Sequence, residues 1–194
     1  MHTKTVEEIK RITRVNKSVE TNRLTLRLPN KLIQVLQNES EKRDLPLNAV
    51  INRILSKNVI FDMRMNARPT IIMSQALFSK ILVQLDEQRQ KWIVQYVPKS
   101  VKELFILHNL KYDLTNVIEN HFSIMAKYCG WYTFNYDITG NKYRLVFESD
   151  LGQAWLSFLK LYIRSIIHSM RINITNEVSE ESVLVFEIVC TINS

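Results

Sequence analysis

The side chains that most often catalyse reactions or bind metals are few in this sequence. They are four histidines and two cysteines: His2, His108, His121, His168, Cys129 and Cys190. The sequence has no HExxH zinc motif, no CxxC pair and no GxSxG nucleophile, and its 3 glycines are too few for a phosphate-binding loop. No pair of carboxylates stands out as an acid and a base. We therefore expect no catalytic site, no metal site and no cofactor.

His121 and Cys129 come closest to a metal-binding pattern. They are eight residues apart, so a helix would place them two turns apart on one side, where they could supply two ligands. The simpler interpretation is structural. His121 falls beside Phe122 and Met125 on an apolar helix face, which favours a hydrogen-bonded core histidine. Cys129 and Cys190 are interpreted as buried thiols, with a redox or metal-binding pair as the alternative.

Positive charge is concentrated in the first third of the chain. The 194 residues have a formal net charge of +7. Residues 1–64 carry 13 Lys and Arg against 7 Asp and Glu, whereas residues 65–194 carry 13 against 12. This asymmetry indicates a polyanionic partner for the N-terminal part, either nucleic acid or an acidic surface. The alternative is a solvated basic arm.

A short segment with strict alternation is the element that would position these charges. In RLTLRL (23–28), the polar side chains Arg23, Thr25 and Arg27 share one face and three leucines share the other, which predicts a strand. Pro29 ends the strand and opens a helix over 30–42. The sequence DLP at 44–46 interrupts the helical pattern, and apolar spacings of three and four predict a second helix over 47–57.

One strand and two short helices cannot form a stable fold alone, because the strand lacks a partner for its backbone groups. The simplest solution is a dimer in which two copies pair their strands antiparallel. Such a two-stranded ribbon has a basic outer face that fits the major groove of B-DNA. A strand of some other α+β domain is the alternative.

Residues 23–57, RLTLRLPNKLIQVLQNESEKRDLPLNAVINRILSK, resemble a ribbon-helix-helix DNA-binding domain, the class that includes the Arc and MetJ repressors. The resemblance implies that Arg23, Thr25 and Arg27 contact bases. It implies phosphate contacts at Asn22, Lys31, Leu47, Asn48 and Arg53. It implies a dimer core of Leu24, Leu26, Leu28, Val50, Ile51 and Ile54. Two positions depart from the family pattern: Asp44 stands where glycine is common, and Pro46 stands near the usual Ser or Thr cap.

A second domain of α+β class is predicted after a connector at 61–72. The connector extends the second helix and then forms a short strand at 70–72. Ser74 caps a helix to about Gln90, with Leu77, Ile81, Leu82 and Leu85 facing inward. A strand over 92–97 and a helix over 99–108 follow. Asp113 caps the next helix, which ends at Gly130.

The clearest pattern in this domain is a hairpin of strands 131–138 and 143–148. A Gly-Asn loop places Phe134 opposite Phe147 and Asp137 opposite Arg144, so that one register explains both an apolar face and a charge pair. Asp150 is predicted to cap a helix that runs to Met170. A final hairpin of strands 171–175 and 183–190 closes the chain.

The aromatic residues of this domain are most simply its core. The alternative is that some of them line an apolar pocket for a small-molecule effector. That pocket would consist of Phe134, Tyr136, Trp155, Phe158 and Tyr162.

We therefore expect an α+β protein with a basic arm (1–20), a ribbon-helix-helix domain (21–60), the connector and a sensing or oligomerising domain (73–194). The expected function is sequence-specific transcriptional regulation as a homodimer, or a higher oligomer, on double-stranded DNA. The alternatives are an antitoxin, a non-specific architectural DNA-binding protein and, less favoured, an enzyme in the second domain. No apolar run approaches the about 20 residues that cross a bilayer. A cytoplasmic, nucleoid-associated protein is expected, without membrane contact.

Overall fold

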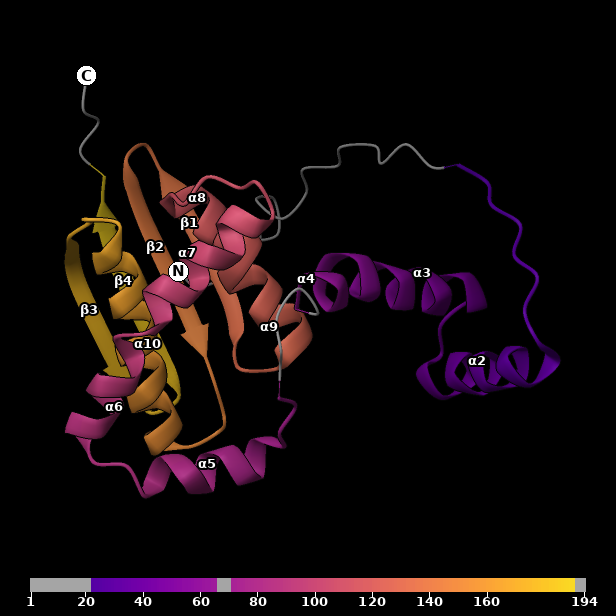
Figure 1. The fold of residues 1–194 in the computed structure, drawn as a ribbon, viewed down its shortest axis with the longest axis horizontal. Helices are drawn as coiled ribbons and strands as arrows, with labels where there is room; N and C mark the ends of the chain where they lie inside the picture. The colour runs from indigo at the N-terminus through magenta and orange to yellow at the C-terminus, as the bar shows by residue number, and fades with distance from the viewer. Residues whose placement is uncertain (1–21, 66–70, 191–194) are drawn as a thin grey trace, which may run out of the picture. The chain divides into compact units, whose positions relative to one another are not determined.

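A computed structural model describes residues 22–65 and 71–190, so the predicted arm at 1–20 lies outside the described residues. The chain is of mixed α+β class: helices come first, and the later part forms a four-stranded antiparallel sheet (Figure 1). The chain divides into two compact units, Met1–Val50 and Ile51–Ser194. None of the described helices has both the length and the apolar sequence that crossing a bilayer requires.

Two helices follow Pro29, as predicted: α2 (Asn30–Arg43) and α3 (Leu47–Lys57). Asp44 ends α2 in the left-handed conformation, with φ 50° and ψ 48°, and its N–H donates to carbonyls of the last turn. Asp therefore takes the place that glycine usually has, since a short polar side chain tolerates this conformation. Pro46 then opens α3 by accepting from the N–H groups of Ala49 and Val50.

The strand predicted over 23–28 is not present in the single chain. Residues 22–29 have no regular secondary structure, and Leu24 and Leu26 are 75% and 47% exposed. The physical reason is that a strand is defined by pairing, and this chain contains no second segment that pairs with it among the described residues.

The second helix continues through a π-helical turn, η1 (Asn58–Asp62), into α4 (Met63–Met65), so the connector extends the helix as predicted. Phe61 and Met65 pack against the core of the second unit. The strand predicted at 70–72 is wrong for Ile71 and Ile72, which are almost fully exposed and without regular structure; Thr70 lies outside the described residues.

The helix predicted from Ser74 to Gln90 is two helices, α5 (Gln75–Val83) and α6 (Glu87–Val94). Ser74 caps α5 as predicted, but Asp86 starts a new helix by accepting from the N–H of Arg89 at 2.8 Å. Of the four residues expected to face inward, Leu82 is buried and Leu85 packs against the core, whereas Leu77 and Ile81 are exposed.

The strand predicted over 92–97 is wrong. Trp92, Ile93 and Val94 end α6, and Val97 begins α7 (Val97–Leu107), which corresponds to the helix predicted over 99–108. In the run WIVQYV, five of the six residues are apolar or aromatic, so no period separates a strand from a buried helix segment, and here the neighbouring helical turns decide.

The helix from Asp113 to Gly130 is confirmed, with a π-helical turn in its middle. It consists of α8 (Leu114–Val117), η2 (Ile118–Phe122) and α9 (Ser123–Cys129). The Asp113 side chain accepts from the N–H of Asn116 at 3.0 Å, and Gly130 ends the helix at φ 63°.

The sheet has the order β1-β2-β4-β3. Its strands are β1 (Thr133–Thr139), β2 (Lys142–Glu148), β3 (Ile174–Glu180) and β4 (Val183–Val189), and α10 (Gln153–Ser169) joins the two hairpins. The predicted register of the first hairpin is confirmed, including Phe134 opposite Phe147 and Asp137 opposite Arg144.

Two details near these hairpins differ from the prediction. Asp150 does not cap α10: Gly152 holds the N-cap position at φ 87°, and the Gln153 side chain donates instead to the Glu181 carbonyl at 2.6 Å. The third strand begins at Ile174 rather than 171, because Arg171 takes a positive φ directly after α10. The core lies between α10, the helices before the sheet and the inner sheet face, where Leu145, Phe147 and Phe186 are fully buried.

Candidate functional site

The side chains predicted to contact DNA are all on the surface of the single chain. Arg23, Thr25 and Arg27 are exposed, as the predicted base contacts must be. The predicted phosphate contacts Asn22, Lys31, Asn48 and Arg53 are also exposed, and Leu47 is half-buried. The structure therefore leaves every polar member of the set free to meet a partner.

The start of α3 has backbone donors that the helix does not use. Its first helical bonds are donated by Ala49 and Val50, to Pro46. The N–H groups of Leu47 and Asn48 donate to no acceptor among the described residues. Such unused N–H groups, together with the helix dipole, are suited to an anion.

The side chains predicted to form a dimer core are largely uncovered. Val50 is buried, with 4% exposure, whereas Ile54 is 49% exposed and Leu28 and Ile51 are half-buried. Helix α2 has no buried residue at all, and its Leu32 and Val35 are exposed. Apart from Val50, the apolar side chains of this segment are thus mostly uncovered by the other described residues.

Of the five residues proposed to line an effector pocket, Phe134, Tyr136 and Phe158 line neither of the two hollows described below. Phe134 and Tyr136 stack on each other along β1, with ring centroids 5.6 Å apart, and Phe134 also contacts Phe122 and Phe147. Trp155, Phe158 and Tyr162 lie on α10. Trp155 borders one of two neighbouring hollows and Tyr162 borders the other. The prediction of a pocket-lining role is therefore retained only for these two residues.

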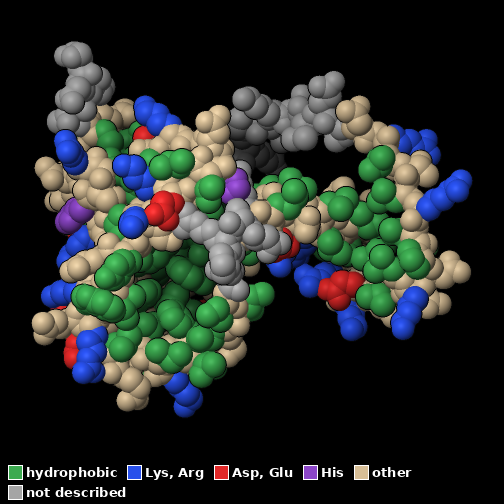
Figure 2. All heavy atoms as spheres, viewed as in Figure 1, with side chains coloured by type: hydrophobic (Ala, Val, Ile, Leu, Met, Phe, Trp, Pro, Cys, Tyr) green, Lys and Arg blue, Asp and Glu red, His purple; other side chains and the backbone are tan. Residues whose placement is uncertain are grey.

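The two hollows adjoin at Trp131 and Ile71, which line both. The first has a volume of about 340 Å³ and is lined mainly by Met73, Gln75, Phe78, Cys129, Leu151 and Trp155. The second, of about 490 Å³, is lined by residues of α7 and by Met65, His121, Met125 and Tyr162. Figure 2 shows apolar side chains gathered around a hollow of the second unit between α5 and α7.

Trp131 lines both hollows, although it is not one of the five residues named for the predicted pocket. Its ring contacts Trp155 at 5.4 Å and Tyr162 at 5.5 Å between centroids. Its position directly after the helix that ends at Gly130, and before β1, is a sequence signal that places it between the helices and the sheet.

His121 is a buried, hydrogen-bonded core histidine, as predicted. It is 5% exposed, and its Nε2 lies 2.6 Å from the hydroxyl of Tyr162. Burial lowers the pKa of His121 to about 4. The imidazole is therefore neutral at physiological pH.

The two cysteines are free thiols with separate surroundings. The Cys129 Sγ donates to the Met125 Sδ at 3.7 Å, and burial raises the pKa of Cys129 to about 11. Cys190 is bound through its backbone to Asn141 at the turn of the first hairpin. Among the described residues, no three His, Cys, Asp or Glu side chains gather as a metal-binding group.

Comparison of the chain with models of known protein families, with curated proteins and with solved structures finds no match.

Proposed function

We propose that the chain is a dimeric, sequence-specific DNA-binding regulator whose segment 22–57 forms a ribbon-helix-helix domain with a second copy. The observation that carries the proposal is the alternating segment 23–28, whose Arg23, Thr25 and Arg27 alternate with three leucines. Antiparallel pairing of two such segments would satisfy the backbone groups that one chain leaves unpaired.

The exposed apolar side chains support the dimer. Leu24, Leu26 and Val35 are 75%, 47% and 57% exposed, and Ile54 and Leu55 of α3 are also exposed. Burying one such side chain contributes about 1.5–3 kcal/mol. A second copy that covers these faces therefore offers the stabilisation that the segment does not obtain within one chain.

The polar face of the paired segments has the chemistry to read bases. Arginine can donate two hydrogen bonds to guanine, and threonine can bond a base or contact a thymine methyl group. The free N–H groups of Leu47 and Asn48 and the cations of Lys31 and Arg53 would hold the phosphates beside the reading face. The excess of positive charge before residue 65 agrees with phosphate contacts in the N-terminal segment.

The second unit is proposed to sense a small apolar effector in the adjoining hollows around Trp131. Their volumes of about 340 and 490 Å³ lie in the usual range for ligand pockets, and their walls are mostly apolar. The polar groups among the lining residues include the side chains of Gln75, Ser100 and His121 and the hydroxyl of Tyr162, which are few enough to orient a ligand without making the site hydrophilic.

The test is DNA binding by the full chain after selection of preferred sites from random duplexes. Arg27→Ala should lose about 1–3 kcal/mol of affinity for the selected site and much less for random DNA. Arg89→Ala, an exposed arginine of α6, is the matched control and should bind both DNAs like the parent chain. Equal losses on both DNAs would contradict base reading, and failure to enrich any site would favour an architectural role.

A further inference from the structure

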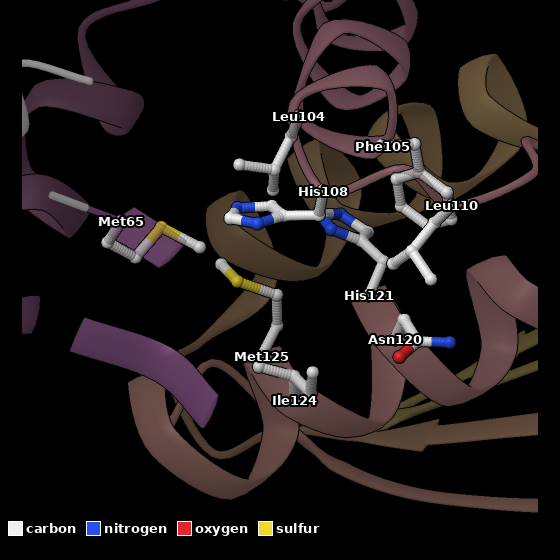
Figure 3. A pocket seen from close by; sticks show the side chains of 9 residues that line it. All are labelled: Met65, Leu104, Phe105, His108, Leu110, Asn120, His121, Ile124 and Met125. Atoms are coloured by element: carbon white, nitrogen blue, oxygen red, sulfur yellow. The ribbon is translucent and has the colours of Figure 1, made fainter. Parts of the chain in front are cut away.

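A small cavity in the second unit brings together two imidazoles and two thioethers. It has a volume of about 10 Å³ and is lined by nine residues, among them Met65, His108, His121 and Met125 (Figure 3). The four side chains come from four different elements: α4, the end of α7, η2 and α9. A cavity of this size accepts a single water molecule or ion and no organic ligand.

His108 has an unused nitrogen at this cavity. Its Nε2 is buried and has no hydrogen-bond partner among the described residues. Figure 3 shows the His108 ring extending toward the sulfur atoms of Met65 and Met125. A buried nitrogen without a partner indicates that a further atom belongs beside it, either a water or an ion.

The neighbouring histidine is held in a fixed orientation. The Nε2 of His121 shares its hydrogen bond with Tyr162, so Nδ1 is the ring nitrogen left for an ion. A hydrogen bond to the second nitrogen is how proteins usually orient a metal-binding imidazole.

From this arrangement we propose that the cavity binds one copper(I) ion through the thioethers of Met65 and Met125 and the Nε2 of His108, with His121 beside it. Thioether ligands select soft ions such as copper(I) over zinc or magnesium. No charged side chain lines the cavity among the described residues, so a monovalent ion is less costly to bury there than a divalent one.

The cavity has an entry route, and a thiol lies near it without being part of it. The larger hollow shares Met65, Leu104, His121 and Met125 with the cavity, so an ion can reach it from there. The Cys129 Sγ lies 3.7 Å from the Met125 Sδ but lines the other hollow, not this cavity. The proposal is independent of DNA binding, because it concerns the second unit alone.

The experiment is a copper(I) titration of the full chain without oxygen, in competition with a chromophoric copper(I) chelator. Cys129→Ser and Cys190→Ser are combined in the parent chain so that the thiols cannot account for binding. We expect one copper(I) per chain, and an X-ray absorption spectrum that shows both sulfur and nitrogen neighbours of the copper. Zinc(II) should not compete.

Single substitutions of the proposed ligands test whether the copper(I) ion binds in this cavity. Met65→Leu and Met125→Leu keep the volume of the side chain and remove the sulfur, and each should weaken binding about tenfold or more. Met63→Leu is the control, because Met63 lies on the same helix α4 but is 60% exposed. Absence of binding in the thiol-free chain, or equal affinity in all three variants, would show that the cavity holds only a water. An absorption spectrum without nitrogen neighbours would overturn the part of the proposal that concerns His108.

Discussion

The Nε2 of His121 lies 2.6 Å from the hydroxyl oxygen of Tyr162, and both side chains are buried between η2 and α10. Burial lowers the pKa of His121 to about 4 and raises the pKa of Tyr162. Both groups are therefore neutral over the whole physiological range. Their hydrogen bond ties the helical layer to the long helix that covers the sheet.

The stability of the second unit should depend on pH through His121. In the unfolded chain this imidazole binds a proton near pH 6.5, whereas in the folded chain it does so only near pH 4. The unfolded state therefore binds more protons between these values, and the free energy of unfolding falls as the pH is lowered from about 6.5 to 4. The loss attributable to this group is about 3 kcal/mol.

Urea unfolding followed by tryptophan fluorescence measures this effect, because Trp92, Trp131 and Trp155 all lie in the second unit. His121→Asn is the control, since it keeps a polar group at the site and does not titrate. The difference in unfolding free energy between the two chains should shrink as the pH falls. A difference that stays constant from pH 7 to pH 4 would contradict the pKa given for the folded chain.

Glu177 of β3 should stabilise the contact between the edge strand and α10. Its carboxylate accepts three hydrogen bonds from Arg164, at 2.8 and 2.9 Å from Nη2 and at 3.1 Å from Nε, and pairs with Lys160 at 2.8 Å. Burial by itself would raise the pKa of Glu177, but the hydrogen bonds and charges of Lys160 and Arg164 hold it below its ordinary value. Glu177→Gln should cost about 1–2 kcal/mol in unfolding free energy.

Glu180→Gln, at an exposed position of the same strand, is the matched control. It should change the unfolding free energy by less than about 0.5 kcal/mol. If Glu177→Gln and Glu180→Gln behave alike in urea unfolding, the charge cluster contributes nothing to stability.

The structure agrees best with the sequence-based predictions where the local turn or cap chemistry and the side-chain pairing indicate the same structure. The register of the first hairpin follows from the Gly140–Asn141 turn and from the charge pair of Asp137 and Arg144, which fix the same alignment independently. The caps at Ser74 and Asp113 were also predictable, because a side-chain oxygen placed before an apolar helical pattern satisfies a free N–H.

The sequence-based predictions were wrong or incomplete where contacts between residues far apart in the chain determine the structure. The largely apolar run at 92–97 could be strand or helix, and its place between the helical turns of α6 and α7 selects the helix. Phe61 was assigned to a connector, yet it stacks on Tyr128 with ring centroids 5.6 Å apart. The residues of the small cavity come from four separate elements, so no spacing in the sequence relates Met65 to His108.

Dimer formation should depend on the leucines of the alternating segment. Leu26→Asp would bury an unpaired charge between two copies, so we expect a monomer in sedimentation experiments and no DNA binding. Ile106→Asp is the control: Ile106 is also exposed in the single chain, at 66%, but lies on α7 outside the proposed interface. A Leu26→Asp chain that still sediments as a dimer would refute the ribbon.

The salt dependence of DNA binding should separate phosphate contacts from base contacts. Each cation that neutralises a phosphate releases about one counterion, which steepens the fall of affinity with salt. Lys31→Ala removes one such cation from each copy of the dimer. It should therefore weaken binding to selected and random DNA equally and reduce the slope of log affinity against log salt by about 2. Lys31 is exposed at the start of α2, and Lys102, exposed on α7, supplies the control. Lys102→Ala should leave the slope unchanged, because the proposal places the phosphates on the N-terminal segment, where the net charge before residue 65 is positive. An equal change in slope for both variants would mean that the second unit also binds the phosphate backbone, and the proposed division between reader and sensor would be wrong.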